Sequence, residues 1–214
     1  MMDSDALIRS LAADLRPVPR NAVGLRIAAG LGVGGAATVA LIGWWLGFRP
    51  DFDVAMRGYT FWMKWIYTAS LGTVAVSAAI QLARPEPVPL RGLWLLGLPV
   101  LLLAAIGLVE MARTPSDQWF AMWLGRSWKQ CPWIVLRLSI PIFIGLLWAY
   151  RRLAPTRLRA AGAAAGLAAG ACAATLYCLH CPETSAMFVL TWYSLGIAAM
   201  AAIGALVGPR LLRW

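Results

Sequence analysis

The chain has 214 residues, of which 61% are hydrophobic and only 13% are charged, and its mean hydropathy is +0.70. A soluble domain carries about 45–50% apolar and about 25% charged residues. This composition therefore excludes a water-soluble globular protein and indicates a chain embedded in a lipid bilayer. The net charge of +10 does not require a nucleic-acid partner, because Lys and Arg near the ends of membrane spans set the orientation of membrane proteins.

Residues 1–20 form the one sizeable stretch with a water-facing pattern. Ser4 can cap a short helix, which Pro17 and Pro19 then prevent from continuing. Apolar residues recur in it at helical spacing and predict one stripe: Leu7, Ile8, Leu11 and Leu15. A helix this short is marginal in water on its own, so we expect it to bind a partner or, alternatively, to lie on the lipid surface.

Six apolar runs follow, each near the ~20 residues that cross a bilayer core. The predicted spans are residues 27–48, 60–82, 93–112, 133–150, 160–179 and 186–207. Glycines four residues apart predict close helix packing, with dimerisation as an alternative role: Gly30 and Gly34; Gly162, Gly166 and Gly170; Gly204 and Gly208. The predicted fold is an all-α membrane protein, with a cytoplasmic amphipathic segment and tether over residues 1–20 and a six-helix transmembrane domain over 21–214.

The distribution of Lys and Arg among the connections predicts the orientation. Twelve lie on the side of the amino terminus: Arg9, Arg16, Arg20, Arg26, Arg84, Arg91, Arg151, Arg152, Arg157, Arg159, Arg210 and Arg213. Five lie on the opposite side: Arg49, Arg57, Arg113, Arg126 and Lys129. Because Lys and Arg accumulate on the cytoplasmic side, we predict a multi-pass protein of the bacterial inner membrane with both termini in the cytoplasm.

Two of the four cysteines are candidates for chemistry. Cys131 and Cys181 are each followed by Pro at the outer end of a predicted span, where we expect water to reach them. The outer compartment is oxidising, so the pair can form a permanent bridge or a reversible switch operated by oxidants or by a thiol-seeking metal. Cys172 and Cys178 lie inside the fifth predicted span and are expected to pack as small hydrophobic residues.

A metal site is the competing interpretation of the same two loops. Cys131, His180, Cys181 and Glu183 offer thiolate, imidazole and carboxylate groups, but their spacing matches no structural zinc pattern. We therefore expect no stable metal site, only transient capture of a soft metal by the two thiolates. Protonated His180 is expected to lower the pKa of a neighbouring thiol. The other candidate supports of the pair are Pro132, Pro182 and Glu183.

Three charged residues lie inside predicted spans: Lys64, Glu110 and Arg137. Charged groups are costly in lipid and are candidates for functional sites. All three fall near the outer end of their spans, so a path for ions or protons through the middle of the membrane is not indicated. We expect Glu110 to pair with Lys64 or with Arg137.

The long outer connection, residues 113–132, is rich in large apolar side chains. They are Trp119, Phe120, Met122, Trp123 and Trp128. Because indoles favour the membrane interface, an aromatic belt is the expected role. The alternative is a lid over a pocket that contains the thiols.

Several motifs in order along the chain resemble the NrsF family of bacterial membrane anti-sigma factors. They are Leu-Ile-Arg-Ser-Leu-Ala-Ala-Asp-Leu-Arg-Pro-Val at residues 7–18, Cys131-Pro132-Trp133, and His180-Cys181-Pro182-Glu183, in a chain with six spans. The resemblance covers essentially the whole chain. The His-x3-Cys-x2-Cys pattern of soluble zinc-type anti-sigma factors is absent.

The resemblance implies a non-enzymatic regulator that needs no cofactor. Such a protein holds an extracytoplasmic-function sigma factor at the inner membrane and releases it under heavy-metal or oxidative stress, with Cys131 and Cys181 as the sensing pair. The implied partners are that sigma factor and membrane lipid, with no direct nucleic-acid contact. The amino-terminal segment would take part in sigma binding through Leu7, Ile8, Leu11, Asp14, Leu15 and Arg16.

The alternative function is a membrane thiol–disulfide oxidoreductase or a metal-handling membrane protein. Cys178 and Cys181 have the Cys-x-x-Cys spacing of such oxidoreductases, and a redox assay with a quinone acceptor separates the two functions. A transporter would need polar ligands at the middle of the membrane and broken helices, which the sequence does not show.

Overall fold

The computed structural model describes residues 21–85 and 91–213, together with positions 4, 8, 12, 13 and 19. All regular elements within these residues are helices. The predicted amino-terminal helix therefore lies largely outside the described residues. Of its candidate contact residues only Ile8 is described, and its side chain is exposed.

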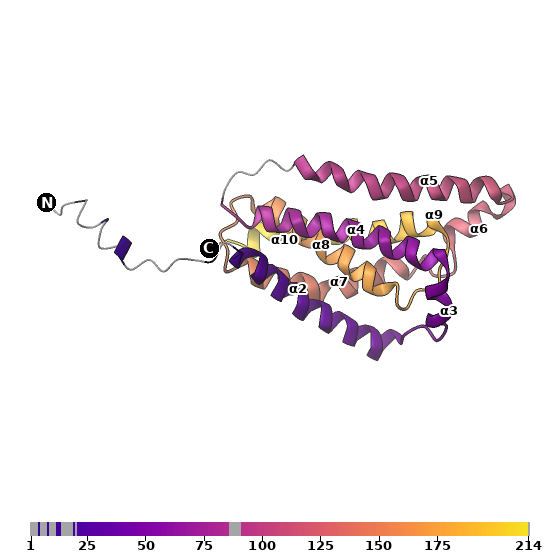
Figure 1. Cartoon of the computed structure of the whole chain (residues 1–214), viewed down its shortest axis with the longest axis horizontal. Coiled ribbons are helices and arrows are strands. Elements are labelled where there is room, and N and C mark those ends of the chain that lie inside the picture. Colours follow the sequence, from indigo (N-terminus) through magenta and orange to yellow (C-terminus); the bar gives the residue numbers. More distant parts are fainter. Residues whose placement is uncertain are drawn as a thin grey trace.

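Six helices are long and apolar enough to cross a membrane, as the sequence predicts, and each bound lies within five residues of its predicted position. They run over Ala22–Leu46, Tyr59–Leu82, Trp94–Arg113, Cys131–Tyr150, Leu158–Tyr177 and Ala186–Leu211. In Figure 1 they are α2 (Ala22–Leu41) with η1 (Ile42–Leu46), α4 (Tyr59–Leu82), η2 (Arg91–Leu96) with α5 (Gly97–Arg113), α7 (Cys131–Tyr150), α8 (Leu158–Tyr177), and α9 (Ala186–Phe188) with η4 (Val189–Tyr193) and α10 (Ser194–Leu211). The short elements are α3 (Phe52–Arg57), η3 (Ser116–Gln118) and α6 (Trp119–Leu124).

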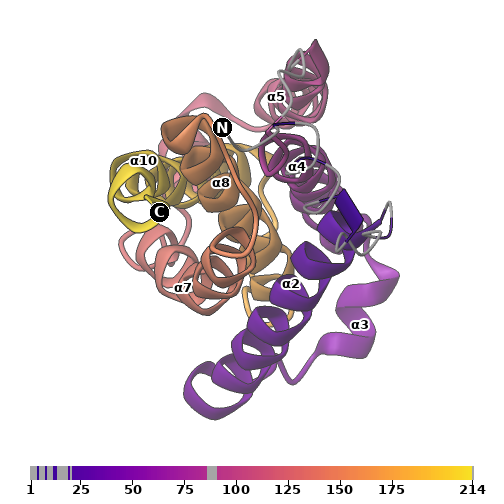
Figure 2. The same ribbon diagram turned by 90° about the vertical axis from the view of Figure 1, so that its left-hand side faces the viewer.

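Helix α8 is the centre of the bundle. Viewed end-on, α10, α7 and α4 surround it, α2 packs against α7, and α5 lies outside α4 (Figure 2). The sequence of α8 explains this position, because it consists largely of Ala and Gly. Small residues let helix backbones approach closely, which is how helices associate in lipid.

The predicted glycine faces are used for packing inside the chain. A Cβ atom at Gly162 of α8 would overlap the carbonyl oxygen of Gly204 on α10, and one at Gly204 would overlap that of Gly162. Helices α2 and α7 meet in the same way at Gly30 and Gly145. Because these faces are buried within the bundle, they are not free for the alternative role in dimerisation.

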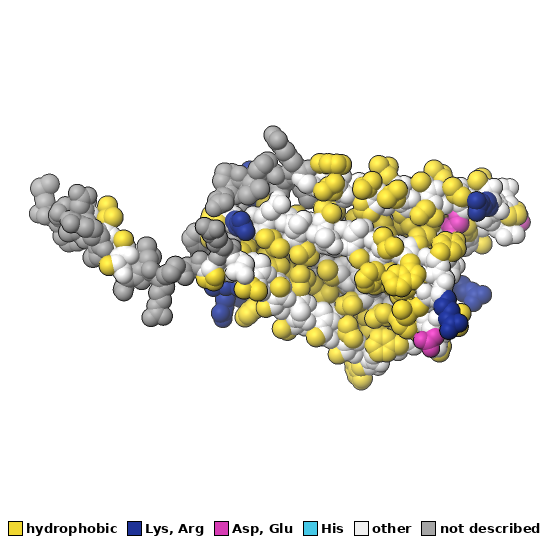
Figure 3. Space-filling model, viewed as in Figure 1, with side chains coloured by type: hydrophobic (Ala, Val, Ile, Leu, Met, Phe, Trp, Pro, Cys, Tyr) yellow, Lys and Arg dark blue, Asp and Glu magenta, His cyan; other side chains and the backbone are white. Residues whose placement is uncertain are grey.

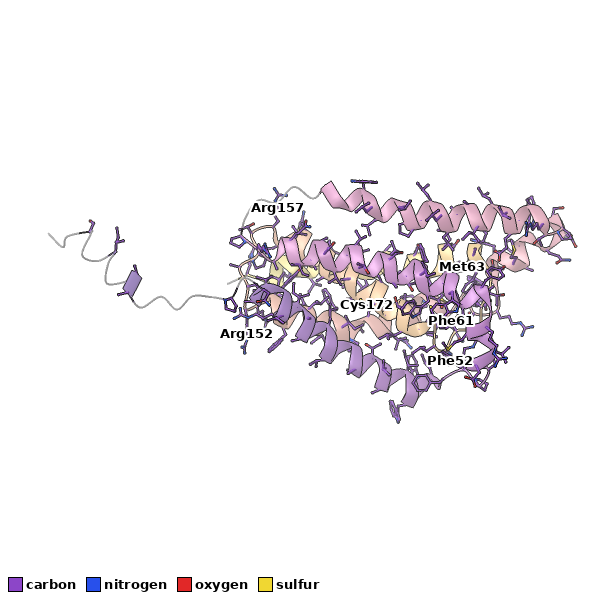
Figure 4. The ribbon with its side chains drawn as sticks, in the orientation of Figure 1. Phe52, Phe61, Met63, Arg152, Arg157 and Cys172 are labelled. Carbon is purple, nitrogen blue, oxygen red and sulfur yellow. The ribbon has the colours of Figure 1, made fainter. Side chains whose placement is uncertain are left out.

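The two ends of the bundle differ in charge. The end at which α2 begins carries many arginines, which we call the arginine-rich end: Arg26, Arg84, Arg151, Arg152, Arg157, Arg159, Arg210 and Arg213. Arg152 and Arg157 lie there in Figure 4. Figure 3 shows dark blue side chains at both ends and an apolar surface between them, with the acidic side chains of this view at the opposite end. The distribution matches the expected asymmetry.

Side-chain hydrogen bonds link helices at the arginine-rich end, and two of them are short. The Tyr150 hydroxyl of α7 donates to the carbonyl of Ala79 in α4 at 2.8 Å. Arg26 Nη1 donates to the carbonyl of Arg152 at 2.7 Å. Helices α2, α4 and α7 are thus joined at this end by polar contacts as well as by packing.

The opposite end contains two π-helical turns and two glycines with positive φ angles. The π-helical turns η1 and η4 both lie there, and Gly47 and Gly125 adopt positive φ angles of 74° and 57°. Turns of the π type occur frequently at functional sites. This end therefore combines unusual backbone with the two Cys-Pro loops.

We predict that Gly162→Ala destabilises the bundle, because the added methyl group meets backbone that has no room to move. Overpacking of this kind costs about 1–3 kcal/mol, and the midpoint of thermal unfolding in detergent should fall. Gly32→Ala is the matched control, since its Cβ has open space and Ala favours a helix over Gly. An unchanged midpoint for Gly162→Ala would contradict the close contact of α8 with α10.

Candidate functional site

The structure brings the two candidate thiols together at the end opposite the arginines. Cys131 is the first residue of α7, and Cys181 lies in the loop between α8 and α9. Both are free thiols, and their side chains interact directly. Both side chains are 0% exposed. The expectation that water reaches them is therefore wrong, because the helices and the loop 113–132 close over this end of the bundle.

Local hydrogen bonds fix the backbone of both cysteines. The amide of Cys131 donates to the carbonyl of Ser127 at 2.8 Å, and the amide of Cys181 donates to the carbonyl of Tyr177 at 3.0 Å. The Tyr177 ring packs against His180 on one side and Tyr193 on the other, with centroid distances of 5.8 and 5.6 Å. The Cys181 loop thus lies beside three packed aromatic rings.

Lys64 of α4 is buried beside the Cys181 loop. Its side chain is 1% exposed. The ammonium donates to the carbonyl of Cys181 at 3.0 Å and to the carbonyl of Glu183 at 2.5 Å. It is therefore a fixed positive charge that ties α4 to the loop carrying one of the thiols.

Glu183 ties the same loop to the segment that precedes Cys131. Its Oε1 accepts hydrogen bonds from the amide of Arg126 at 2.8 Å, the amide of Ser127 at 3.1 Å and the Ser127 hydroxyl at 3.0 Å. Because Ser127 also holds the Cys131 amide, this carboxylate positions one Cys-Pro loop relative to the other.

The expected pairing of Glu110 is wrong. Its Oε2 accepts from the amide of Ala186 at 2.8 Å and from the Ser185 hydroxyl at 3.2 Å, at the start of α9. The ammonium of Lys64 instead donates to the carbonyls of Cys181 and Glu183, and Arg137 lies over the Trp45 ring at 5.7 Å. A carboxylate at a helix amino terminus meets unpaired amides and a favourable dipole, which explains its choice of partner.

The other residues that the sequence predicts to support the thiol pair have different roles. His180 Nδ1 is hydrogen-bonded to the carbonyl of Gly47 at 2.8 Å, so the ring joins this loop to the end of η1 instead of facing the thiols. Pro132 occupies the first turn of α7, where its lack of an amide hydrogen is harmless. Pro182 is exposed in the loop.

The loop 113–132 packs against η4 through some of its aromatic residues. The Trp123 and Trp128 rings pack on Trp192, each with a centroid distance of 5.4 Å. Trp123 Nε1 donates to the Thr191 hydroxyl at 3.1 Å. These contacts join the loop to η4, and we call the three packed indoles the tryptophan cover: Trp123, Trp128 and Trp192. Trp119 and Phe120 remain exposed, as residues of an aromatic belt would be.

The environment favours ionisation of Cys181. Hydrogen bonding with Cys131 lowers the pKa of the Cys181 thiol, and the charge of Lys64 and the Tyr193 hydroxyl act in the same direction against the effect of burial. Cys178 is also fully buried. The Cys178 thiol donates to the carbonyl of Ala174 at 3.3 Å within its own helix. Cys178 is thus packed inside the bundle, as the sequence predicts.

Sequence reasoning missed Tyr193. Its side chain is fully buried next to the cysteines, and within the described residues its hydroxyl has no hydrogen-bond partner. Tyrosine in an apolar span resembles any interfacial aromatic residue, so no signal in the sequence distinguishes it. Among the described residues no cluster of three or more His, Cys, Asp or Glu residues could hold a metal ion.

Comparison with known proteins assigns the chain to a family. The family model NrsF, described as negative regulator of sigma F, matches residues 11–214. The anti-sigma-F factor NrsF of Caulobacter vibrioides (strain NA1000 / CB15N) is 42% identical over 215 aligned residues, which cover all of both chains. The probable anti-sigma-F factor NrsF of Azospira oryzae (strain ATCC BAA-33 / DSM 13638 / PS) is 38% identical over 216 aligned residues, with the same coverage.

No solved structure matches the chain. The matches extend through both Cys-Pro loops and all six apolar helices. Anti-sigma factors bind a sigma factor, and their role is regulatory and not enzymatic. By its sequence over its full length, this chain belongs to the NrsF family of negative regulators of sigma F.

Proposed function

We propose that the protein is an integral inner-membrane anti-sigma factor that holds a sigma factor of the extracytoplasmic-function type. The amino-terminal segment binds the sigma factor in the cytoplasm through its apolar stripe. Release follows when oxidants or thiol-seeking metal ions react with Cys131 and Cys181 on the periplasmic side. The observation that carries this proposal is the buried pair of free thiols at the end of the bundle opposite the arginines.

The position of the pair supports a role in signalling across the bilayer. Cys131 begins α7, and Cys181 follows α8, and these two helices pack together along the membrane. Any reaction that changes the sulfur–sulfur separation therefore acts on the relative position of two core helices. Well-packed interiors respond by moving between discrete arrangements and not by gradual deformation.

A signal works only if the reacted and unreacted states differ in their affinity for the sigma factor. A difference of a few kcal/mol moves most of a two-state population. The packing of α7 against α2 gives a route toward the amino-terminal segment, because α2 begins at Ala22, directly after it. The route joins the thiols to the sigma-binding end through helices that contact one another.

We predict that Cys131→Ser abolishes release of the sigma factor while membrane insertion and sigma binding persist, because serine keeps the size but not the reactivity of the thiol. The measurement is co-purification of sigma factor with membranes before and after treatment with diamide or with cadmium. Cys172→Ser is the matched control, since Cys172 lies on α8 (Figure 4) away from the pair and should release normally. Full release from Cys131→Ser membranes would refute the sensing role.

We also predict that a chain lacking residues 1–18 no longer retains sigma factor in a pull-down from membranes. The bundle itself should be unaffected, because its six helices begin at Ala22. Leu11→Ser should weaken retention by disrupting the apolar stripe, whereas Arg9→Ser, off the stripe, should not. Equal retention by the full-length and shortened proteins would place the sigma-binding surface elsewhere.

A further inference from the structure

Lys64 is a buried cation that lacks an acidic partner. Among the described residues, Arg49 and Asp51 form an ion pair at 2.7 Å, whereas no carboxylate lies within ion-pair distance of Lys64. Its ammonium has two carbonyl acceptors but no counter-charge. Burying an uncompensated charge costs several kcal/mol, so buried charges are normally paired. The Lys64 ammonium therefore needs a nearby anion, and no carboxylate among the described residues supplies it.

The thiol of Cys181 is the group placed to supply it. Lys64 donates to the carbonyl of this same residue, and its charge acts on the sulfur. Hydrogen bonding with Cys131 favours a negative charge on that sulfur, and the Tyr193 hydroxyl, which has no hydrogen-bond partner among the described residues, lies close to it. The ionisable groups around Cys181 are Lys64, Arg49, Cys131, Tyr177, Cys178, Tyr193 and Glu183, whose carboxylate is bound by the amides of Arg126 and Ser127. Of the two cations, Arg49 is already neutralised by Asp51.

We infer that Lys64 is the counterion of a thiolate at Cys181 and thereby makes Cys181, and not Cys131, the thiol that reacts first. The inference rests on the proposed sensing role of the pair and names the residue that favours ionisation of the reacting thiol. Lys64 is a positioning residue, since it acts on the reagent only through the sulfur of Cys181. The direction in which the pKa of Cys181 is shifted agrees with this geometry.

The assignment orders the oxidation chemistry. With hydrogen peroxide as the oxidant, the Cys181 thiolate attacks one oxygen and breaks the O–O bond, giving a sulfenic acid and hydroxide. The Cys131 thiol then attacks that sulfur and loses its proton, the S–O bond breaks, and water leaves. The sum is thiolate, thiol and peroxide giving disulfide, water and hydroxide, with two electrons passing from sulfur to oxygen.

The same assignment gives Lys64 a part in the signal. A disulfide carries no charge, so its formation leaves the ammonium buried without its counterion. Relief of that cost requires the ammonium, and the start of α4 with it, to move relative to the Cys181 loop. Helix α4 also packs along α8 and is bonded to α7 through Ala79 at the other end. Helix α4 is therefore the element whose position changes when the thiolate charge is lost.

The test is site-resolved alkylation of the full-length protein in detergent with iodoacetamide between pH 5 and 10, followed by peptide mass spectrometry. The thiolate displaces iodide, so the rate follows the ionised fraction. In the unmodified chain Cys181 should be alkylated before Cys131. Lys64→Met should slow alkylation of Cys181 about tenfold at pH 7 and move the midpoint of its rate to higher pH by about one unit. Lys64→Arg should restore most of the rate.

Lys129→Met is the matched control, because it removes the same charge near Trp128 at the same end of the bundle and should leave Cys181 unchanged. A purely structural role for Lys64 would speed alkylation of both cysteines through loosened packing, and that result would overturn the inference. Alkylation of Cys131 first in the unmodified chain would also overturn it, without any variant. Because sigma release is not measured, these outcomes are independent of the release test on Cys131→Ser.

Discussion

The close backbone approach of α8 to its neighbours is the constraint on which the arrangement depends. At Gly162 and Gly204 there is no room for a side chain on either helix. In lipid the hydrophobic effect does not drive helices together, so association relies on van der Waals contact and hydrogen bonds. The Ala- and Gly-rich face of α8 provides that contact. It brings the end of α8 and the starts of α7 and α9 to one place, where the cysteines meet.

The site is held by charged side chains that bind backbone groups instead of one another. Lys64 binds two carbonyls, Glu183 binds two amides and a hydroxyl, and Glu110 binds the start of α9. Each therefore fixes a loop at the end of the bundle. Such a network leaves the cysteines in a defined geometry without a permanent bridge between them. Chemistry at sulfur can then alter the geometry, which a structural disulfide would prevent.

The fold could be predicted from the sequence because each span is a long apolar run, and the first, fifth and sixth also carry glycines four residues apart. The sequence also distinguishes Cys131 and Cys181 from Cys172, because only these two adjoin Pro at span ends. The partners of Lys64 and Glu110 could not be predicted from the sequence. Lys64 and Glu110 look like a pair in sequence, yet each finds backbone groups nearby that their spans alone do not reveal. Burial of the thiols was missed for the same reason, because it depends on a loop folding back over the helices.

The complete burial of the two thiols has a consequence for the speed and selectivity of any reaction at sulfur. Because Cys131 and Cys181 are 0% exposed, a reagent reaches the sulfurs only when the surrounding structure opens, so the opening frequency sets an upper limit on the reaction rate. A small uncharged molecule needs a brief, narrow opening, whereas a hydrated ion must also shed water to enter. Burial thus selects, by the size and hydration of a reagent, which molecules react with the two sulfurs at an appreciable rate.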